Sequence, residues 1–184
     1  MTPGSVWLGA RSLLWLVLLP GVVAGWVPWR TFGLDRLRLD LSRPEHAAGL
    51  AAVAAGAALL VACVWEFARR GRGTLAPLDP PRDLVVRGPY RFVRNPMYLS
   101  VVTIVLGEAL MAGSRALLLY GAGFAVLATL MVMGYEEPGL RGRFGASYVA
   151  YCGRVRRWLP RLRPDRRNGP TVAAASLRSR GAPE

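Results

Sequence analysis

Two groups of polar residues stand at opposite ends of a long apolar stretch of the chain. The first lies within RGPYRFVRNPMYL, residues 87–99, and the second is the acidic pair at 136 and 137. Arginine side chains present forked donors, an asparagine amide both donates and accepts, and carboxylates accept and favour cations. Such a set suits recognition of a polar ligand, which a simple membrane anchor would not need. Its members are Tyr90, Arg91, Arg94, Asn95, Tyr98, Glu136 and Glu137.

The two apolar runs between these groups predict how they meet. Residues 96–114 and 116–135 are long enough to cross a bilayer as helices, and only Ser114 and Arg115 separate them. A tight antiparallel hairpin is therefore expected. The first helix would rise about 26 Å and the second fall about 28 Å, so Asn95 and Glu136 should return to one membrane interface. A plainer interpretation is that the tyrosines and arginines only anchor helix ends, and that the acids only pair with Arg141, one helical turn on.

Two further apolar runs, residues 12–29 and 47–65, bring the predicted number of spans to about four. The fold class expected is an all-α integral membrane protein. Pro20 should kink the first run. A rival interpretation of that run is a signal peptide cleaved near residues 22–24.

The amino-acid composition indicates which classes of protein this chain can belong to. The chain has 184 residues, is 53% hydrophobic, and carries 24 basic against 11 acidic residues, for a net charge of +13. Arginines concentrated between apolar blocks indicate a membrane protein rather than a nucleic-acid-binding one. One histidine, His46, and two distant cysteines, Cys63 and Cys152, predict free thiols, no metal site and no histidine base. His46 is expected to be an interfacial residue without a functional role.

Arginine distribution predicts the orientation. Residues 69–94 and the chain from Arg141 onward are the most arginine-rich connecting segments, which places both in the cytoplasm and both termini inside. The arginines between Arg30 and Glu45 would then lie outside, in mild conflict with this rule. We expect a bacterial inner-membrane location.

Three regions are expected along the chain. Residues 1–68 form a two-span membrane region, residues 69–164 the region that carries the chemistry, and residues 165–184 a flexible basic tail. The segment SYVAYCGRVRRWLPRLRP, 147–164, is basic and aromatic. It is expected to be a cytosolic amphipathic segment that lies on the anionic inner leaflet. There it would serve as a membrane anchor, as a wall of the cofactor pocket, or in both roles.

Two other acids are candidates of uncertain role. Glu108 lies inside an apolar run, where an ionisable side chain suggests function, but pairing with Arg115 is the favoured expectation. Glu66 is expected to pair with Arg69 and Arg70, or to face the pocket.

The sequence from GTLAPLDPPRDLVVRGPYRFVRNPMYL through the hairpin and EE to FGASYVAYCGRVRRWLP, roughly residues 66–160, resembles the isoprenylcysteine carboxyl methyltransferase and phospholipid methyltransferase superfamily, in its bacterial branch. The family pattern is Arg-His-Pro-x-Tyr, a hydrophobic hairpin, then Glu-Glu. Asn95 replaces the histidine, and Arg156 stands where members often have proline. The matching residues are Arg94, Pro96, Tyr98, Glu136 and Glu137.

The resemblance implies a membrane methyltransferase that binds S-adenosyl-L-methionine at the cytosolic face and methylates a small lipophilic or lipid-linked acceptor. It implies catalytic roles for Arg94, Asn95 and Glu137. Asn95 cannot act as a base, which favours an acidic or pre-activated acceptor. The expected cofactor-binding residues are Tyr90, Arg91, Arg94, Asn95, Pro96, Tyr98, Glu136 and Glu137. Two alternatives stay open: an NADPH-dependent membrane reductase of the sterol-reductase type, which the acidic pair disfavours, and a non-enzymatic membrane subunit.

Overall fold

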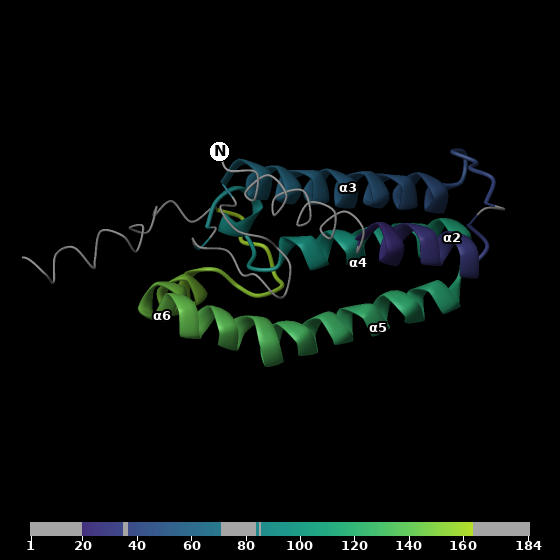
Figure 1. Cartoon of the computed structure of the whole chain (residues 1–184). Helices are drawn as coiled ribbons and strands as arrows, with labels where there is room; N and C mark the ends of the chain where they lie inside the picture. The colour runs from purple at the N-terminus through teal and green to yellow at the C-terminus, as the bar shows by residue number, and fades with distance from the viewer. Residues whose placement is uncertain (1–19, 35–36, 71–83, 85, 164–184) are drawn as a thin grey trace, which may run out of the picture.

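The computed structural model describes residues 20–34, 37–70, 84 and 86–163, with side chains omitted at 67–70. Within these residues the regular secondary structure is all helical, without strands, which confirms the all-α expectation (Figure 1). The helices are η1 (Val22–Trp26), α2 (Val27–Thr31), α3 (Pro44–Arg70), η3 (Gly88–Arg91), α4 (Pro96–Ala112), α5 (Arg115–Met131), η4 (Val132–Glu136) and α6 (Glu137–Arg154).

Two of these helices are long and apolar enough to cross a membrane. They are Pro44–Glu66 and Arg115–Arg154, whereas Pro96–Ala112 is apolar but shorter. The second of these is kinked at Gly145, where φ is 49°. Before the kink, residues 115–135 already rise about 30 Å, a full hydrocarbon thickness, so the acids that follow lie beyond the crossing. Most of the predicted first span lies before the described residues. Pro20 is the first described residue, and residues 22–24, the possible cleavage site, belong to η1. The part described after Pro20 is helical, in η1 and α2.

Helices α3 and α4 pack closely side by side because glycines line their contact (Figure 1). A Cβ atom added at Gly49 would lie 2.6 Å from the carbonyl oxygen of Gly107, and one at Gly56 would lie 2.8 Å from that of Ser100. The pairing order is reversed along the two helices, so they run antiparallel. Without a side chain at these positions, the two backbones approach to van der Waals contact, the packing mode that membrane helices favour.

The predicted tight hairpin joins α4 to α5. Gly113 ends α4 in the left-handed conformation, with φ of 58°, which costs glycine little. Ser114 then caps α5, its Oγ accepting the N–H of Leu117 at 3.2 Å. The expectation of an antiparallel hairpin at 114–115 is confirmed.

A wide helical turn separates α5 from α6. In η4 the Glu137 N–H bonds to the carbonyl of Val132, five residues back, and Pro138 follows with no N–H to offer the next carbonyls. The turn η1 has the same form, since the Val27 N–H bonds to Val22 O and Pro28 follows. Such wide turns change the face on which later side chains emerge.

The end of α6 belongs to a second core rather than to an exposed amphipathic helix. Phe144, Tyr148 and Tyr151 of α6 are buried together with Val155. The chain then turns back as a short irregular segment, residues 155–161, which we call the clasp. Its backbone is tied to the segment before α4, because the Arg94 N–H donates to Arg156 O at 2.9 Å and the Arg161 N–H to Phe92 O at 3.0 Å.

Candidate functional site

The residues that open α4 are held in place by the clasp. Asn95 occupies the cap position of α4, but its side chain makes no capping bond. Instead its Nδ2 donates to the carbonyl of Arg157 at 3.3 Å. Pro96 follows at the first helical position and is buried, where a proline lacks no needed N–H. The predicted positions 94–96 therefore form the junction between α4 and the clasp.

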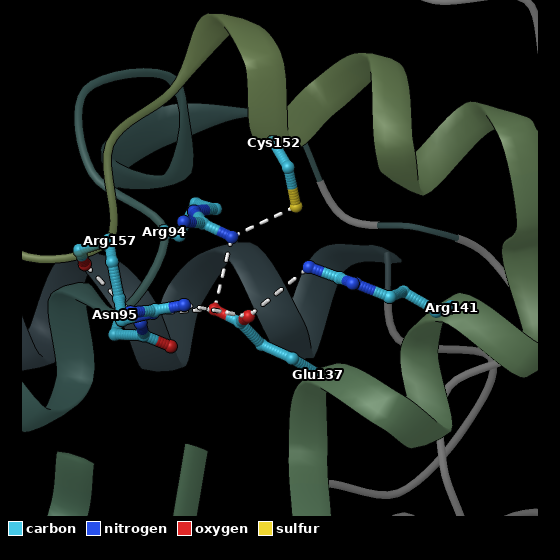
Figure 2. Close-up of polar contacts among 6 residues, drawn as sticks. All are labelled: Arg94, Asn95, Glu137, Arg141, Cys152 and Arg157. Carbon is cyan, nitrogen blue, oxygen red and sulfur yellow. Dashed lines mark hydrogen bonds and ion pairs between the residues drawn. The ribbon is translucent and has the colours of Figure 1, made fainter. Parts of the chain in front are cut away.

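Glu137 lies at the centre of a cluster of arginines, shown in Figure 2. Its Oε1 accepts Arg94 Nη1 at 3.0 Å and Arg157 Nε at 2.7 Å. Its Oε2 accepts Arg157 Nη2 at 2.9 Å, and Arg141 lies 3.9 Å away, one helical turn on. The fork from Arg157 is bidentate, the strongest arrangement between a guanidinium and a carboxylate. We call Glu137, Arg94, Arg141 and Arg157 the Glu137 cluster.

The electrostatics of the Glu137 cluster favour an ionised glutamate. The Glu137 side chain is only 6% exposed, so its charge depends on its partners. Hydrogen bonds from Arg157, with the charges of Arg94, Arg157 and Arg141, lower the pKa of Glu137 despite burial. Three arginines against one carboxylate leave the cluster with surplus positive charge, which suits an anionic group of a ligand.

One atom of the Glu137 cluster lacks a hydrogen-bond partner. Arg94 donates from Nη1 both to Glu137 and to Cys152 Sγ, the latter at 2.9 Å. Its Nε is buried with no hydrogen-bond partner. A buried guanidinium N–H without an acceptor costs free energy, so Arg94 has an unused donor within the cluster.

Glu136 meets a different set of residues. Its Oε1 accepts the hydroxyl of Tyr98 at 2.5 Å. The Tyr98 ring in turn packs 6.3 Å, between centroids, from Phe124 of α5 and 6.3 Å from Trp158 of the clasp. We call Glu136, Tyr98, Phe124 and Trp158 the Glu136 group. Burial raises the pKa of Glu136, and the neighbouring charge of Glu137 adds to this rise.

The Tyr90 side chain is partly buried. It lies beside Cys63 of α3, and the Tyr90 backbone carbonyl accepts the Tyr151 hydroxyl at 2.8 Å. It is also close enough to Glu136 to feel that charge. Tyr90 and Arg91 both belong to η3, so η3 joins the end of α3 to the site.

The two uncertain acids lie at different ends of the bundle. Glu66 packs against Gly88, where an added Cβ would fall 2.5 Å from Glu66 Cγ, so it faces the segment that carries the site. Its expected partners, Arg69 and Arg70, lie outside the described side chains. Glu108 lies near the other end of α4, where its Oε2 is buried without a hydrogen-bond partner. No ion pair joins it to Arg115 within the described residues, so that expectation is wrong, because Arg115 is exposed at the hairpin.

Both cysteines are free, as expected, and His46 is buried. The His46 Nδ1 accepts the N–H of Asp40 at 3.0 Å, which ties the loop to the start of α3. No cluster of metal-binding side chains is present in the described part of the chain.

The structure thus brings together the two polar groups that the hairpin separates in sequence, as predicted. Contacts of Arg94 with Glu137 and of Tyr98 with Glu136 span 43 and 38 positions. Two contributors are not predicted from the sequence: Arg157 and, as a partner of Arg94, Cys152. Trp158 belongs to the basic aromatic segment that the sequence offers as a wall of the pocket. The role of Arg157 depends on the return of the clasp, for which that basic aromatic run is the signal in the sequence.

Residues 44–147 match the family model of phospholipid methyltransferases. The match covers more than half of the chain, including α3, η3, α4, α5 and the acidic pair, and it ends before the clasp. No curated protein sequence matches this chain. The apolar helices, the site at the open end of the hairpin and the family match agree, and the chain belongs to the phospholipid methyltransferase family, a family of membrane methyltransferases.

Proposed function

We propose that this protein transfers a methyl group from S-adenosyl-L-methionine to a small lipophilic or lipid-linked acceptor. The reaction takes place at the cytosolic face of a bacterial inner membrane, with both chain termini inside. Membership of the family supports a methyltransferase. The arginine-rich character of the α6 end supports a cytosolic placement.

The observation that carries the cofactor proposal is the pair of unused hydrogen-bonding groups at the site. Arg94 Nε is a buried donor without an acceptor, which fits the carboxylate of the cofactor's amino-acid end. Glu136 accepts one hydrogen bond from Tyr98, and a carboxylate has about four acceptor positions, so it can also take an ammonium or ribose hydroxyl. A donor for an anion and an acceptor for a cation in one site fit a zwitterionic ligand.

The cofactor, when bound, supplies an electrophilic methyl group on a sulfonium. The protein's own residues would bind and orient the cofactor. Arg94 would hold its carboxylate, and Glu136 would hold its cationic part. Glu137, whose oxygens are already occupied by arginines, acts as a positioning residue that fixes Arg94 and Arg157. Tyr90 and Tyr98 limit the site on its apolar side.

The acceptor must arrive ready to react, because the site has no evident base. Asn95 is neutral at all working pH values and donates its amide to Arg157 O. Methyl transfer is an in-line displacement in which positioning supplies much of the rate. An anionic acceptor needs no deprotonation, so we propose an acidic or otherwise pre-activated acceptor that enters from the lipid.

Calorimetric titration of purified protein with S-adenosylhomocysteine tests this proposal. The wild type should bind, and Glu136→Gln should weaken binding at least about tenfold, the effect of losing a hydrogen bond to a charged group. Glu45→Gln, the same change at the far end of α3, serves as the matched control and should bind as the wild type does.

NADPH is titrated in parallel. Binding of NADPH without binding of S-adenosylhomocysteine would favour a reductase. Binding of neither ligand would favour a non-enzymatic membrane subunit.

A further inference from the structure

The clasp presents two different faces. Three side chains point inward. Val155 is buried, Arg157 donates hydrogen bonds to Glu137, and Trp158 packs on Tyr98. The residues between and after them are exposed. We call the exposed residues of the clasp and of the two positions after it the outer patch: Arg156, Leu159, Arg161, Leu162 and Arg163. Arg161 is exposed, and its guanidinium also donates to the carbonyl of Arg154.

The outer patch has the composition of a surface that rests on lipid. Leu159 is 64% exposed and Leu162 fully exposed, and arginines flank them on both sides. Apolar side chains alternating with guanidinium groups insert into the headgroup region while the charges meet anionic lipid. The patch carries three positive charges and no acid, so its complement is a negatively charged surface.

The position of the outer patch agrees with the level of a membrane interface. The clasp is bonded to Phe92 and Arg94, directly before the apolar helix α4. The neighbouring end of α3 carries Trp65, which is 58% exposed at the end of a candidate span. Exposed tryptophan at a span end is typical of the headgroup level.

We propose that the outer patch docks on anionic lipid, and that this docking holds the clasp closed over the site. The residues that would contact lipid and the residues that bond to Phe92 and Arg94 belong to the same short segment. Restraining the outward side chains on lipid therefore favours the state in which these backbone hydrogen bonds are formed. A ligand shifts an equilibrium toward the state it binds better. In the closed clasp Arg156, Arg161 and Arg163 are exposed, while Arg157 bonds to Glu137 and Trp158 packs on Tyr98.

Hydrogen exchange of two backbone amides measures the closed clasp directly. The N–H groups of Arg94 and Arg161 are bonded across the clasp. We would compare full-length protein in nanodiscs of neutral phosphatidylcholine with nanodiscs containing anionic phosphatidylglycerol. Exchange of peptides covering 92–95 and 156–163 should be about tenfold slower or more in the anionic discs, given three arginines at the surface.

The triple variant Arg156→Gln, Arg161→Gln and Arg163→Gln should lose this difference. A matched triple variant, Arg30→Gln, Arg38→Gln and Arg115→Gln, removes equal charge from exposed positions at the opposite end and should keep it. Exchange that is equal in both lipids, or faster in anionic lipid, would overturn the proposal, and so would an equal loss in the matched variant. If the first variant fails to fold, the comparison of the wild type in the two lipids still decides.

A second measurement separates this proposal from the proposed function. Affinity for S-adenosylhomocysteine should rise several-fold in anionic discs, and only this consequence rests on the cofactor assignment. Slower exchange of the clasp without any S-adenosylhomocysteine binding would support the docking and contradict the cofactor. Binding that is equal in both lipids, with slower exchange, would overturn the coupling of the clasp to the site.

Discussion

Glu136 and Glu137 follow each other in the chain but meet different partners. Glu137 is 6% exposed and bonded to Arg94 and Arg157, whereas Glu136 meets one hydroxyl, that of Tyr98. Neighbouring helical residues point in different directions, so Glu137 reaches Arg94 and the clasp residue Arg157 while Glu136 reaches Tyr98 of α4. Glu137 therefore stabilises the fold through its arginine partners, and Glu136 keeps free acceptor positions for a ligand.

The largest expected effect is on stability, from Glu137→Gln. The substitution leaves Arg94 and Arg157, whose side chains are 13% and 28% exposed, without their carboxylate. Breaking one side of a fully buried ion pair costs about 3–5 kcal/mol, and this partly exposed pair should lose less than that. The thermal unfolding temperature in detergent should fall strongly, while Glu136→Gln should lower it far less. Equal destabilisation by the two variants would contradict the division between them.

The next effect is on ligand binding, from Glu136→Gln. Loss of an ionic acceptor should weaken S-adenosylhomocysteine binding by about tenfold to a hundredfold with the protein still folded. Calorimetry on samples of matched thermal stability measures this. A folded variant with unchanged affinity would remove Glu136 from the site.

The pH dependence should differ between the two carboxylates. The pKa of Glu136 is raised above 4.5 by burial, so its charge, and ligand binding with it, should be lost on acidification before an ordinary glutamate would protonate. The pKa of Glu137 is lowered below 4.5. Its contribution to stability is present above the unfolded value and is lost only as the pH falls through the folded value.

The affinity for S-adenosylhomocysteine and the unfolding temperature are measured together from about pH 7.5 to about 4.5. This separates the pH dependence of ligand binding from that of stability. Affinity should decline while the part of stability owed to Glu137 persists. A simultaneous decline of both quantities would show that one group controls both.

The smallest effect is expected from Tyr98→Phe. Removing the hydroxyl leaves the ring contacts to Phe124 and Trp158 but takes one donor from Glu136. A hydrogen bond to a charged group contributes about 1.5–3 kcal/mol, and water or ligand can replace part of it. We expect a loss of affinity of a few fold by calorimetry, with little change in unfolding temperature, and a loss as large as that of Glu136→Gln would make Tyr98 a direct ligand contact.

The meeting of the two polar groups could be predicted because it depends on local rules. A two-residue connection between apolar helices of similar length returns residue 136 to the level of residue 95, and Ser114 is a recognisable helix cap. The all-α fold and the free cysteines follow equally from composition and spacing.

What could not be predicted depends on the path of the chain after α6. The helix continues past the acidic pair, kinks at Gly145 and ends at Arg154. Tyr148 and Tyr151 lie after this kink and are core residues, although their pattern resembles an interfacial anchor. Whether Arg157 turns toward Glu137 is decided by backbone bonds between the clasp and residues 92–94, which leave no local signal. Glu108 was likewise assigned to Arg115 from spacing alone, whereas the hairpin leaves Arg115 exposed.

The most direct test of the account is transfer of a labelled methyl group. Membranes containing the wild-type protein, Glu136→Gln or no protein would be incubated with methyl-labelled S-adenosylmethionine and extracted into organic solvent. The account predicts label in a lipophilic product with the wild type, and a strong reduction with Glu136→Gln at equal protein level. Label at the background level with folded wild-type protein, across membranes of several lipid compositions, would contradict methyl transfer to a lipophilic acceptor.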